Sequence, residues 1–319
     1  MGRVEAICVS AKKGEKKTPV RSAEFVENHG IREDAHAGPW HRQISLLADE
    51  DIARMRGERL PDLAPGAFAE NVVLSGVELG GLGLGSRIRL GETAELSVTQ
   101  IGKVCHARCA IYDLTGDCIM PRQGLFARVL AGGRVSPGDE AVVLQTIPRA
   151  MWQAVILTVS DRCSRGETID TAGPGVADLL RRTLDAHVYR VEVIPDERDR
   201  IEERLRHYCD GHSIDLVLAV GGTGFAPRDV TPEAVAAVVE RLTPGLDEAM
   251  RRASAQKTPH AMLSRAVSGI RRSTLVISLP GSERGAVENL EAILPALDHG
   301  LRKLRGDPAD CGRGRNGQP

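Results

Sequence analysis

Aromatic residues are scarce in this sequence, since Phe, Trp and Tyr make up only 3% of its 319 residues. Few rings are therefore available to stack the bases of a single-stranded nucleic acid. The formal net charge is only −1, from 42 Lys and Arg against 43 Asp and Glu. This balance argues against a protein that binds nucleic acid by neutralising its phosphates. A small phosphorylated ligand is still compatible, because it needs only a local cluster of donors.

Long apolar runs and an export signal are also missing. No stretch approaches the roughly 18 consecutive apolar residues of a membrane span. Residues 1–17 lack the charged-then-apolar order of a secretory signal. The seven cysteines form an odd set without a regular framework, so reduced thiols are the simpler interpretation. These features predict a cytoplasmic protein, and its length is comfortable for two domains.

The sequence pattern changes between residues 146 and 153. Before this point, short β-like runs bounded by Gly, Pro and Asp predict a mostly-β, barrel-like domain over residues 1–147. The runs cover residues 4–10, 42–49, 69–76, 86–92, 94–102 and 138–144. Residues 47–57 and 121–133 are the best candidates for short helices.

After Pro148, strands and helices alternate. Apolar runs at 154–160, 187–194, 215–222 and 274–281 predict strands, and helical patterns follow, among them 201–211, 231–242 and 285–304. Thr231 is expected to cap the helix of 231–242, with Pro232 at its first position. The alternation predicts an α/β three-layer domain with a mostly parallel sheet over residues 153–306. Residues 307–319, rich in Gly, Arg and Pro, are expected to be disordered.

Three predicted strands of this half end in unusual turns. These are Ser160-Asp161, the run Gly221–Gly224 that leads to Arg228, and Pro280-Gly281. In an open α/β sheet, ligands bind beyond the carboxyl ends of the strands. Glycines let the backbone approach a phosphate, and N–H groups at a helix start donate to its oxygens. The turns therefore predict a polyphosphate site.

Two carboxylates near these turns have more than one interpretation. Asp229, beside Arg228, is either a surface ion pair or helix-start carboxylate, or a Mg²⁺ ligand. Asp196 follows a strand and either lies at the same edge or forms a plain turn after Pro195. The residues alone leave these alternatives open.

Five motifs in this half occur together in a particular order. They are SDRxSxGxxxDxxGP at 160–174, VIPDE at 193–197, VLAVGGTGxxxRDVTPEA at 217–234, LSRAVSGIR at 263–271 and LPG at 279–281. In this order and spacing, the region of about 153–305 resembles the molybdopterin adenylyltransferase (Mog-type) family. The resemblance implies a usually trimeric α/β domain that binds molybdopterin and transfers AMP from Mg-ATP to its terminal phosphate.

The resemblance also implies residue roles. Asp196 and Asp229 match the essential acidic residues, with Mg²⁺ assigned to Asp229. The substrate-binding positions are Ser160, Asp161, Gly221, Gly222, Thr223, Gly224, Arg228, Ser264, Arg265, Pro280 and Gly281. The chain departs from the family after its LPG turn, where Ser282-Glu283-Arg284 replaces a segment that often contains another Pro.

The N-terminal half contains a cysteine-rich stretch. Cys105, His106, Cys109 and Cys118 lie within fourteen positions and permit a tetrahedral zinc site, although their spacing is irregular. Alternatively, some of these cysteines are small buried apolar residues, or one is a thiolate activated by neighbouring positive charge. The spacing does not decide among these interpretations.

Residues 30–47, 69–92 and the cysteine stretch that ends in VSPGDE at 135–140 resemble a MOSC domain over about residues 3–145. This β-rich module also occurs at the C-terminus of molybdenum cofactor sulfurases. The resemblance implies a cysteine ligand for sulfur or the metal cofactor, with Cys109 aligning best and Cys105 and Cys118 as further thiols. It offers as pocket candidates His36, His41, Arg42 and Asn71.

Both halves thus point to molybdenum cofactor biosynthesis. The leading prediction is a bifunctional protein whose C-terminal domain adenylylates molybdopterin with Mg-ATP. Its N-terminal domain would bind cofactor, molybdenum or sulfur. The alternative is a non-catalytic carrier that passes cofactor to a molybdenum insertase or to apo-molybdoenzymes. No nucleic-acid or membrane partner is expected.

Overall fold

The protein is represented by a computed structural model that describes residues 1–55, 63–103 and 118–308. The chain divides into two compact units. One comprises Met1–Met151 with Gly211–Ser213, and the other comprises Trp152–Asp210 and the chain from Ile214 onward. The predicted disordered tail lies outside the described residues from position 309. None of the described helices is long and apolar enough to cross a membrane.

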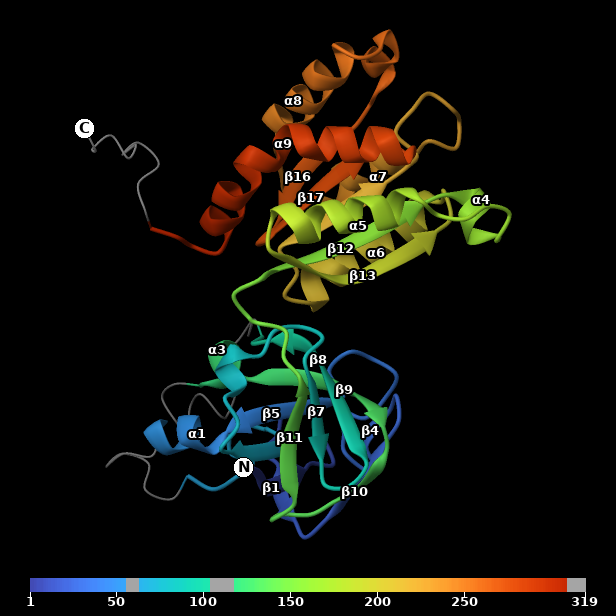
Figure 1. The fold of residues 1–319 in the computed structure, drawn as a ribbon. Coiled ribbons are helices and arrows are strands. Elements are labelled where there is room, and N and C mark those ends of the chain that lie inside the picture. The colour runs from blue at the N-terminus through green and yellow to red at the C-terminus, as the bar shows by residue number, and fades with distance from the viewer. Residues whose placement is uncertain (56–62, 104–117, 309–319) are drawn as a thin grey trace, which may run out of the picture. The chain divides into compact units, whose positions relative to one another are not determined.

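The N-terminal unit is built mainly of strands (Figure 1). Seven strands follow the order β11-β7-β8-β9-β5-β6-β1, and antiparallel pairing of β11 with β1 closes them into a barrel. Strand β2 extends this sheet, and β10, β3 and β4 form a second one. The predicted β-rich barrel is confirmed. The elements are β1 (Gly2–Val9), β2 (Thr18–Val20), β3 (Ala23–Val26), β4 (Gly30–Ile31), β5 (Ile44–Ala48), α1 (Asp49–Met55), β6 (Val72–Ser75), η1 (Leu79–Gly81), β7 (Arg87–Leu90), β8 (Ala94–Ile101), α3 (Met120–Gln123), β9 (Leu125–Ala131), β10 (Gly133–Val135) and β11 (Glu140–Gln145).

The helix predicted over residues 121–133 is wrong. Only the four-residue α3 is helical there, and β9 occupies the rest. Strand β9 pairs with both β5 and β8, which buries Leu125, Ala127 and Val129 in the barrel. A short apolar run fits either a helix or a strand, so the barrel partners decide its conformation.

The C-terminal unit alternates strands and helices (Figure 1). Its sheet has the order β13-β12-β14-β17-β16-β15, in which the first four strands are parallel, β16 pairs antiparallel with β17, and β15 pairs antiparallel with β16. The predicted mostly parallel sheet is confirmed, whereas the three-layer arrangement stays a prediction. The elements are β12 (Trp152–Val159), α4 (Asp161–Ser164), α5 (Ala172–Thr183), β13 (Ala186–Ile194), α6 (Arg198–Gly211), β14 (Leu216–Val220), α7 (Thr231–Val238), β15 (Arg241–Leu242), α8 (Pro244–Ala255), η2 (Pro259–Leu263), β16 (Ser268–Arg271), β17 (Thr274–Leu279) and α9 (Glu283–Leu304).

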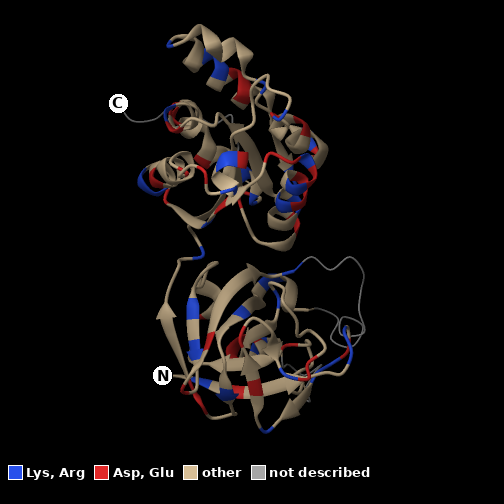
Figure 2. Ribbon diagram, turned by 90° about the vertical axis from the view of Figure 1, so that its right-hand side faces the viewer, with Lys and Arg blue, Asp and Glu red and all other residues tan. Residues whose placement is uncertain are grey.

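The core of this unit lies around the central strands. Every residue of β12, β14 and β17 is buried, as expected for parallel strands covered on both faces. One apolar cluster joins these strands to α5 through Val176 and Leu180 and to α9 through Leu290 and Ile293. Acidic and basic residues are interspersed along the helices (Figure 2). A phosphorylated ligand would therefore depend on specific donors more than on a broad positive surface.

The helix predicted over residues 231–242 differs from α7 at both ends. It ends at Val238, because Arg241 and Leu242 form β15 and pair with β16. The expected cap at Thr231 is wrong, since Val230 occupies that position and Thr231 makes no side-chain capping bond. The Thr231 N–H instead donates to the carbonyl of Gly222 at 3.2 Å, which folds the preceding loop back over the helix start. Helix α8 was not predicted.

Gly300 offers a test of the helical packing of α9. It lies inside this helix, and a Cβ added there would meet nothing within 4 Å. Because Ala is better than Gly in a helix interior by about 1 kcal/mol, we expect Gly300→Ala to raise the free energy of unfolding by about 0.5–1 kcal/mol in urea titrations. Leu297→Ala, at a buried position of the same helix, should instead lower it by about 2–5 kcal/mol. A destabilised Gly300→Ala protein would contradict the open surroundings of this position.

Candidate functional site at the carboxyl edge of the C-terminal sheet

Four parallel strands of the C-terminal unit end at one edge. In the strand register, Val159 of β12 lies beside Ile194 of β13, and Val220 of β14 lies beside Leu279 of β17. The turns that follow these strands are therefore neighbours. They supply most of the predicted site residues: Ser160, Asp161, Asp196, Gly221, Gly222, Thr223, Gly224, Pro280 and Gly281.

Asp161 and Asp196 hold the ends of β12 and β13 together. The backbone N–H of Asp161 donates to Oδ2 of Asp196 at 2.6 Å, and the N–H of Asp196 donates to Oδ1 of Asp161 at 3.0 Å. Arg228 donates to the Asp161 carboxylate from Nε at 2.9 Å and from Nη2 at 2.8 Å. This two-pronged contact is the strong form of an Arg–carboxylate pair. Asp161 therefore ties the loop after β14 to the first two strands.

The two carboxyl groups have opposite pKa shifts. The hydrogen bond from Arg228 lowers the pKa of Asp161 below its usual value. Burial raises the pKa of Asp196, and the negative charges of Asp161 and Asp229 add to this rise. Neighbouring acids with diverging pKa values are typical of catalytic and ligand-binding sites. The shift also shows that negative charge gathers around Asp196.

Gly221 and Gly222 are required by close contacts and by their backbone conformation. Gly221 has φ of +118°, and a Cβ there would lie 2.2 Å from the carbonyl oxygen of Val159. Gly222 has φ of +62°, and its Cβ would lie 2.6 Å from Oγ1 of Thr231 and 3.1 Å from Oδ1 of Asp196. These conformations are rare for residues with side chains. The glycine loop thus packs directly against the carboxylate site.

The loop after β17 joins the same site. The N–H of Gly221 donates to the carbonyl of Leu279 at 2.9 Å. A Cβ on Gly281 would lie 3.3 Å from Cα of Gly221. Ser282 is the first residue of the segment in which this chain departs from the family pattern. Its Oγ accepts a hydrogen bond from the N–H of Gly285 at 3.2 Å and caps α9.

Asp229 lines a pocket in the segment that follows the glycine loop. Its Oδ2 accepts a hydrogen bond from the N–H of Ala226 at 2.8 Å. The pocket has a volume of about 410 Å³. Phe225, another lining residue, keeps 68% of its surface exposed. The lining residues are Phe225, Ala226, Pro227, Asp229, Val230, Glu233 and Arg265.

Arg265 clamps the glycine loop. Its Nε donates to the carbonyl of Gly224 at 2.8 Å, and its backbone N–H donates to the carbonyl of Thr223 at 3.0 Å. Its Nη2 donates to the carbonyl of Asp229, and Nη1 forms an ion pair with Glu233. All three guanidinium nitrogens therefore contact the protein, which gives Arg265 a part in shaping the loop.

Two further predicted positions make local bonds. Ser160 Oγ accepts a hydrogen bond from the N–H of Cys163 at 3.2 Å and caps the short helix α4. Ser264 Oγ accepts a long one from the N–H of Ala266 at 3.4 Å. Both side chains thus hold the backbone of their own turns.

Sequence reasoning missed two residues of this region. Asp170 accepts hydrogen bonds from Oγ1 of Thr158 at 2.7 Å and from the N–H of Gly173 at 3.0 Å, which fixes the entry to α5. Thr231 is fully buried, and its Oγ1 has no hydrogen-bond partner within the described part of the chain. Both residues belong to the quoted motifs, so the motifs were the available signal.

The cysteine candidates of the N-terminal unit are only partly described. Cys105 and Cys109 lie outside the described residues, and so do the zinc and thiolate interpretations that depend on them. Cys118 is buried in an apolar cluster with Cys8, Met120 and Phe126. Within residues 1–55, 63–103 and 118–308, no three His, Cys, Asp or Glu side chains group as metal ligands.

His36 belongs to a buried ion-pair network. Lys17 Nζ lies 2.5 Å from Oδ2 of Asp34, and both side chains are fully buried. The His36 ring lies 3.2 Å from Lys17 Nζ, and its backbone N–H donates to Oδ1 of Asp34 at 2.9 Å. Burial alone would raise the pKa of Asp34, but the hydrogen bonds from His36 and Lys17 and the lysine charge hold it well below its usual range. The network holds the loop before β5 in place.

Two other N-terminal candidates make structural contacts. Asn71 is buried, its Nδ2 donates to the carbonyl of Cys8 at 3.1 Å, and its Oδ1 accepts from the N–H of Ser45 at 3.1 Å. His41 Nε2 lies 3.0 Å from Oε1 of Gln100. Arg42, the fourth candidate, lies against the aromatic rings of Trp40 and Phe126.

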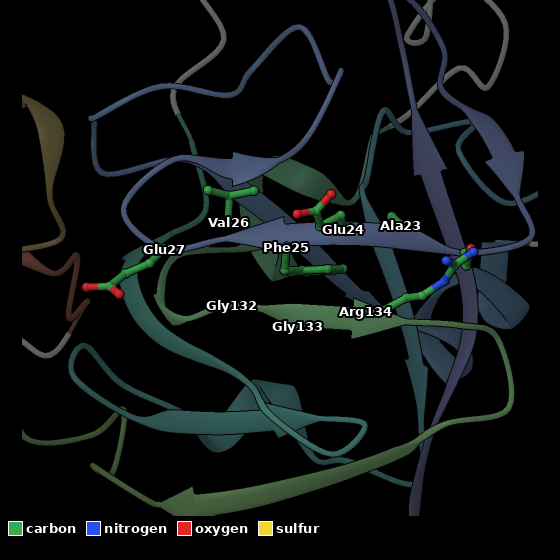
Figure 3. Close-up of a pocket in the computed structure, with 9 residues that line it drawn as sticks. Ala23, Glu24, Phe25, Val26, Glu27, Gly132, Gly133 and Arg134 are labelled. Atoms are coloured by element: carbon green, nitrogen blue, oxygen red, sulfur yellow. The ribbon is translucent and has the colours of Figure 1, made fainter.

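A pocket of about 730 Å³ lies along β3 and β10 (Figure 3). Three of its polar side chains have partners, since Arg32 donates to Glu24 at 2.7 and 2.8 Å and Arg134 donates to Ser22 at 2.7 Å. None of the described candidates His36, His41, Arg42, Asn71 and Cys118 lines this pocket. Its lining residues are Ser22, Ala23, Glu24, Phe25, Val26, Glu27, Gly132, Gly133 and Arg134.

Two family models match the chain, one in each half. The model described as "Probable molybdopterin binding domain" matches residues 155–299, and the MOSC domain model matches residues 33–142. The chain is similar to a molybdopterin adenylyltransferase of Helicobacter pylori (strain J99), with 40% identity over 153 residues. These residues are 48% of this chain and 87% of that enzyme.

Further relatives match about half of the chain. Gephyrin of Dictyostelium discoideum is 40% identical over 166 residues, which are 49% of this chain but only 23% of gephyrin. Among solved structures, the molybdopterin biosynthesis enzyme MoaB of Thermus thermophilus has 46% identity and a TM-score of 0.47. That match covers 50% of this chain and 100% of MoaB.

Proposed function

Because the chain belongs to the molybdopterin-binding family over residues 155–299 and carries a MOSC domain over residues 33–142, we propose that its C-terminal unit is a molybdopterin adenylyltransferase. The observation that carries this proposal is the gathering of Asp161, Asp196 and Arg228 beside the Gly221–Gly222 turn at the carboxyl edge of the sheet. This is where open α/β sheets bind phosphorylated ligands. The similarity to the Helicobacter pylori enzyme supports the same activity.

The proposed reaction is a nucleotidyl transfer. A terminal phosphate oxygen of molybdopterin forms a bond to the α-phosphorus of ATP, and the bond from that phosphorus to the bridging oxygen breaks, releasing pyrophosphate. The attacking group is already anionic, so the site needs positioning and charge neutralisation more than a strong base. The glycine loop lets the backbone approach the phosphates, and Arg228 supplies positive charge beside it.

The donor set at this edge fits a magnesium ion. Mg²⁺ with a nucleotide is usually held by one or two carboxylates, together with phosphate oxygens and water. Asp229 would hold it, with Asp196 as the second carboxylate, because both lie against the same glycine loop. A Cβ on Gly224 would lie 2.8 Å from Oδ2 of Asp229, and one on Gly222 would lie 3.1 Å from Oδ1 of Asp196. When bound, the ion neutralises charge on the phosphate oxygens.

The direct test is to incubate the full chain with molybdopterin, MgCl₂ and ATP and to measure adenylylated pterin by mass spectrometry and pyrophosphate by a coupled assay. Both products are expected in equal amounts. Bound molybdopterin without either product would instead favour the carrier function.

The pH dependence of this reaction follows from Asp196. Its pKa is raised, mainly by burial. The carboxylate form of Asp196 therefore predominates only above a pH that is higher than the pKa of an ordinary Asp, about 3.9. We therefore expect kcat/KM to fall on the acid side at a higher pH than an unperturbed Asp would give. Asp161→Asn removes a neighbouring negative charge and should shift this limb to lower pH. An unchanged limb in the variant would exclude Asp196 as its source.

For the N-terminal unit, we propose binding of cofactor, molybdenum or sulfur, with Cys109 as the ligand and Cys105 and Cys118 as further thiols. The chain would act in the cytoplasm, assemble as a homotrimer through its C-terminal unit and pass its product to a molybdenum insertase or apo-molybdoenzymes. Molybdenum, zinc and sulfane-sulfur analysis of wild type against Cys109→Ser tests the ligand. Equal contents in both proteins would remove Cys109 from this role.

A further inference from the structure

Arg42 is a partly buried cation of the N-terminal unit. It lies just before β5, and its Nε is buried with no hydrogen-bond partner among residues 1–55, 63–103 and 118–308. No carboxylate forms an ion pair with it in the described part of the chain. Burial accordingly lowers the pKa of its guanidinium. Lys17, a buried cation of the same unit, is by contrast paired with Asp34.

Two aromatic rings hold the Arg42 guanidinium. Its Cζ lies 4.9 Å from the centre of the Trp40 ring and 5.8 Å from that of Phe126. Trp40 is itself fixed, because its Nε1 donates to the carbonyl of His36 at 2.7 Å. Contact with ring faces favours a cation but leaves the N–H groups at the guanidinium edge unsatisfied. The side chain is therefore oriented, while its Nε has no acceptor in the described part of the chain.

A second cation lies at the same ring. Lys13 Nζ is 5.2 Å from the centre of the Trp40 ring, so Lys13 and Arg42 both contact this indole. Two like charges around one aromatic group repel each other, and a partly buried charge without a partner lowers stability. An anion bound between or beside these cations would reduce their mutual repulsion and would also pair the partly buried charge.

We propose that Arg42, Lys13 and Trp40 form a binding site for an oxyanion, either a free tetrahedral anion or the phosphate group of a larger ligand. The planar fork of an arginine matches two oxygens of such a group. The site shares no residue with the proposed adenylyl-transfer site; it rests on the binding function proposed for the N-terminal unit and names an oxyanion as the chemical group that is bound.

Tryptophan fluorescence can report on this site in the full chain. The sequence has two tryptophans, so Trp152→Phe leaves Trp40 as the only one. In phosphate-free buffer, we expect inorganic phosphate or phenyl phosphate to change the Trp40 emission saturably. Phenyl phosphate binding more tightly would indicate the phosphate of a larger ligand, and equal affinities would indicate a free anion. No saturable change with either probe would overturn the proposal.

Substitution of Arg42 in the Trp152→Phe background tests whether this residue binds the anion. Arg42→Gln should weaken binding about tenfold to a hundredfold, the range for losing hydrogen bonds from a charged donor. Arg32→Gln is the matched control, because Arg32 is exposed and already paired with Glu24. It should bind both probes as the parent does. Equal affinity in Arg42→Gln and its parent would refute the site.

Thermal unfolding distinguishes anion binding by Arg42 from a purely structural role. It uses a second variant, Arg42→Met, so the test holds even if Arg42→Gln fails to fold. Phosphate should raise the Tm of wild type but not that of Arg42→Met, which keeps contact with the rings. Without anion, Arg42→Met should unfold at the wild-type Tm or above, because an unpaired charge is gone. A lowered Tm without anion, together with a retained response to phosphate, would show that Arg42 only supports the fold.

Discussion

Replacing Asp229 by Asn is expected to slow adenylyl transfer by about 10²- to 10³-fold, the usual effect of removing one electrostatic contact to the reacting phosphates. The substitution removes a negative charge but keeps an oxygen that can accept the hydrogen bond from the N–H of Ala226, now 2.8 Å from Asp229. The glycine loop should therefore keep its shape. Product formation at saturating molybdopterin, measured as a function of MgCl₂, gives the effect on turnover and on the apparent affinity for magnesium.

Asp178→Asn serves as the matched control for Asp229→Asn. Asp178 lies on α5 in the same unit, is exposed and its carboxylate pairs with Arg181 at 2.9 Å. Its substitution makes the same change of charge and should leave turnover at the wild-type rate. Near-wild-type turnover in Asp229→Asn would remove this residue from the metal site and favour Asp196 as the principal carboxylate.

Replacing Gly221 by Ala is expected to lower the free energy of unfolding by about 2–5 kcal/mol. Two effects combine, since φ of +118° is strained for a residue with a side chain and the added Cβ would lie 2.2 Å from the carbonyl oxygen of Val159. That oxygen belongs to the end of β12, so the close contact can be relieved only if a central strand moves. Urea unfolding of the C-terminal unit, followed by Trp152 fluorescence in a Trp40→Phe background, measures the change.

Gly245→Ala is the control for this substitution. Gly245 lies in α8, and a Cβ there would meet nothing within 4 Å. It should leave stability unchanged or raise it by up to about 1 kcal/mol, because Ala is favoured in helices. If both variants unfolded at the same urea concentration, the tight contact at Gly221 would not exist in solution.

The sequence by itself determined the two-part organisation and the class of each part. Short runs separated by glycine turns predicted the barrel, and continuous apolar runs such as residues 154–160 predicted the buried parallel strands. Local hydrophobic periodicity carries this information. The motifs also led to the MOSC and molybdopterin-binding families, which the family models confirm. A match to the order of several motifs does not require knowledge of how they contact one another.

The tertiary structure decided what depends on contacts between distant segments. Residues 125–131 form a strand because β5 and β8 offer pairing partners, although their apolar pattern also suits a helix. Asp161 and Asp196, 35 residues apart in sequence, each donate a backbone N–H to the other's carboxylate, a contact that no local pattern encodes. The same holds for Arg42, which sequence similarity offered only as one of four pocket candidates. Its unpaired charge appears only once folding brings Trp40 and Phe126 to it, because burial and pairing are properties of the packed chain.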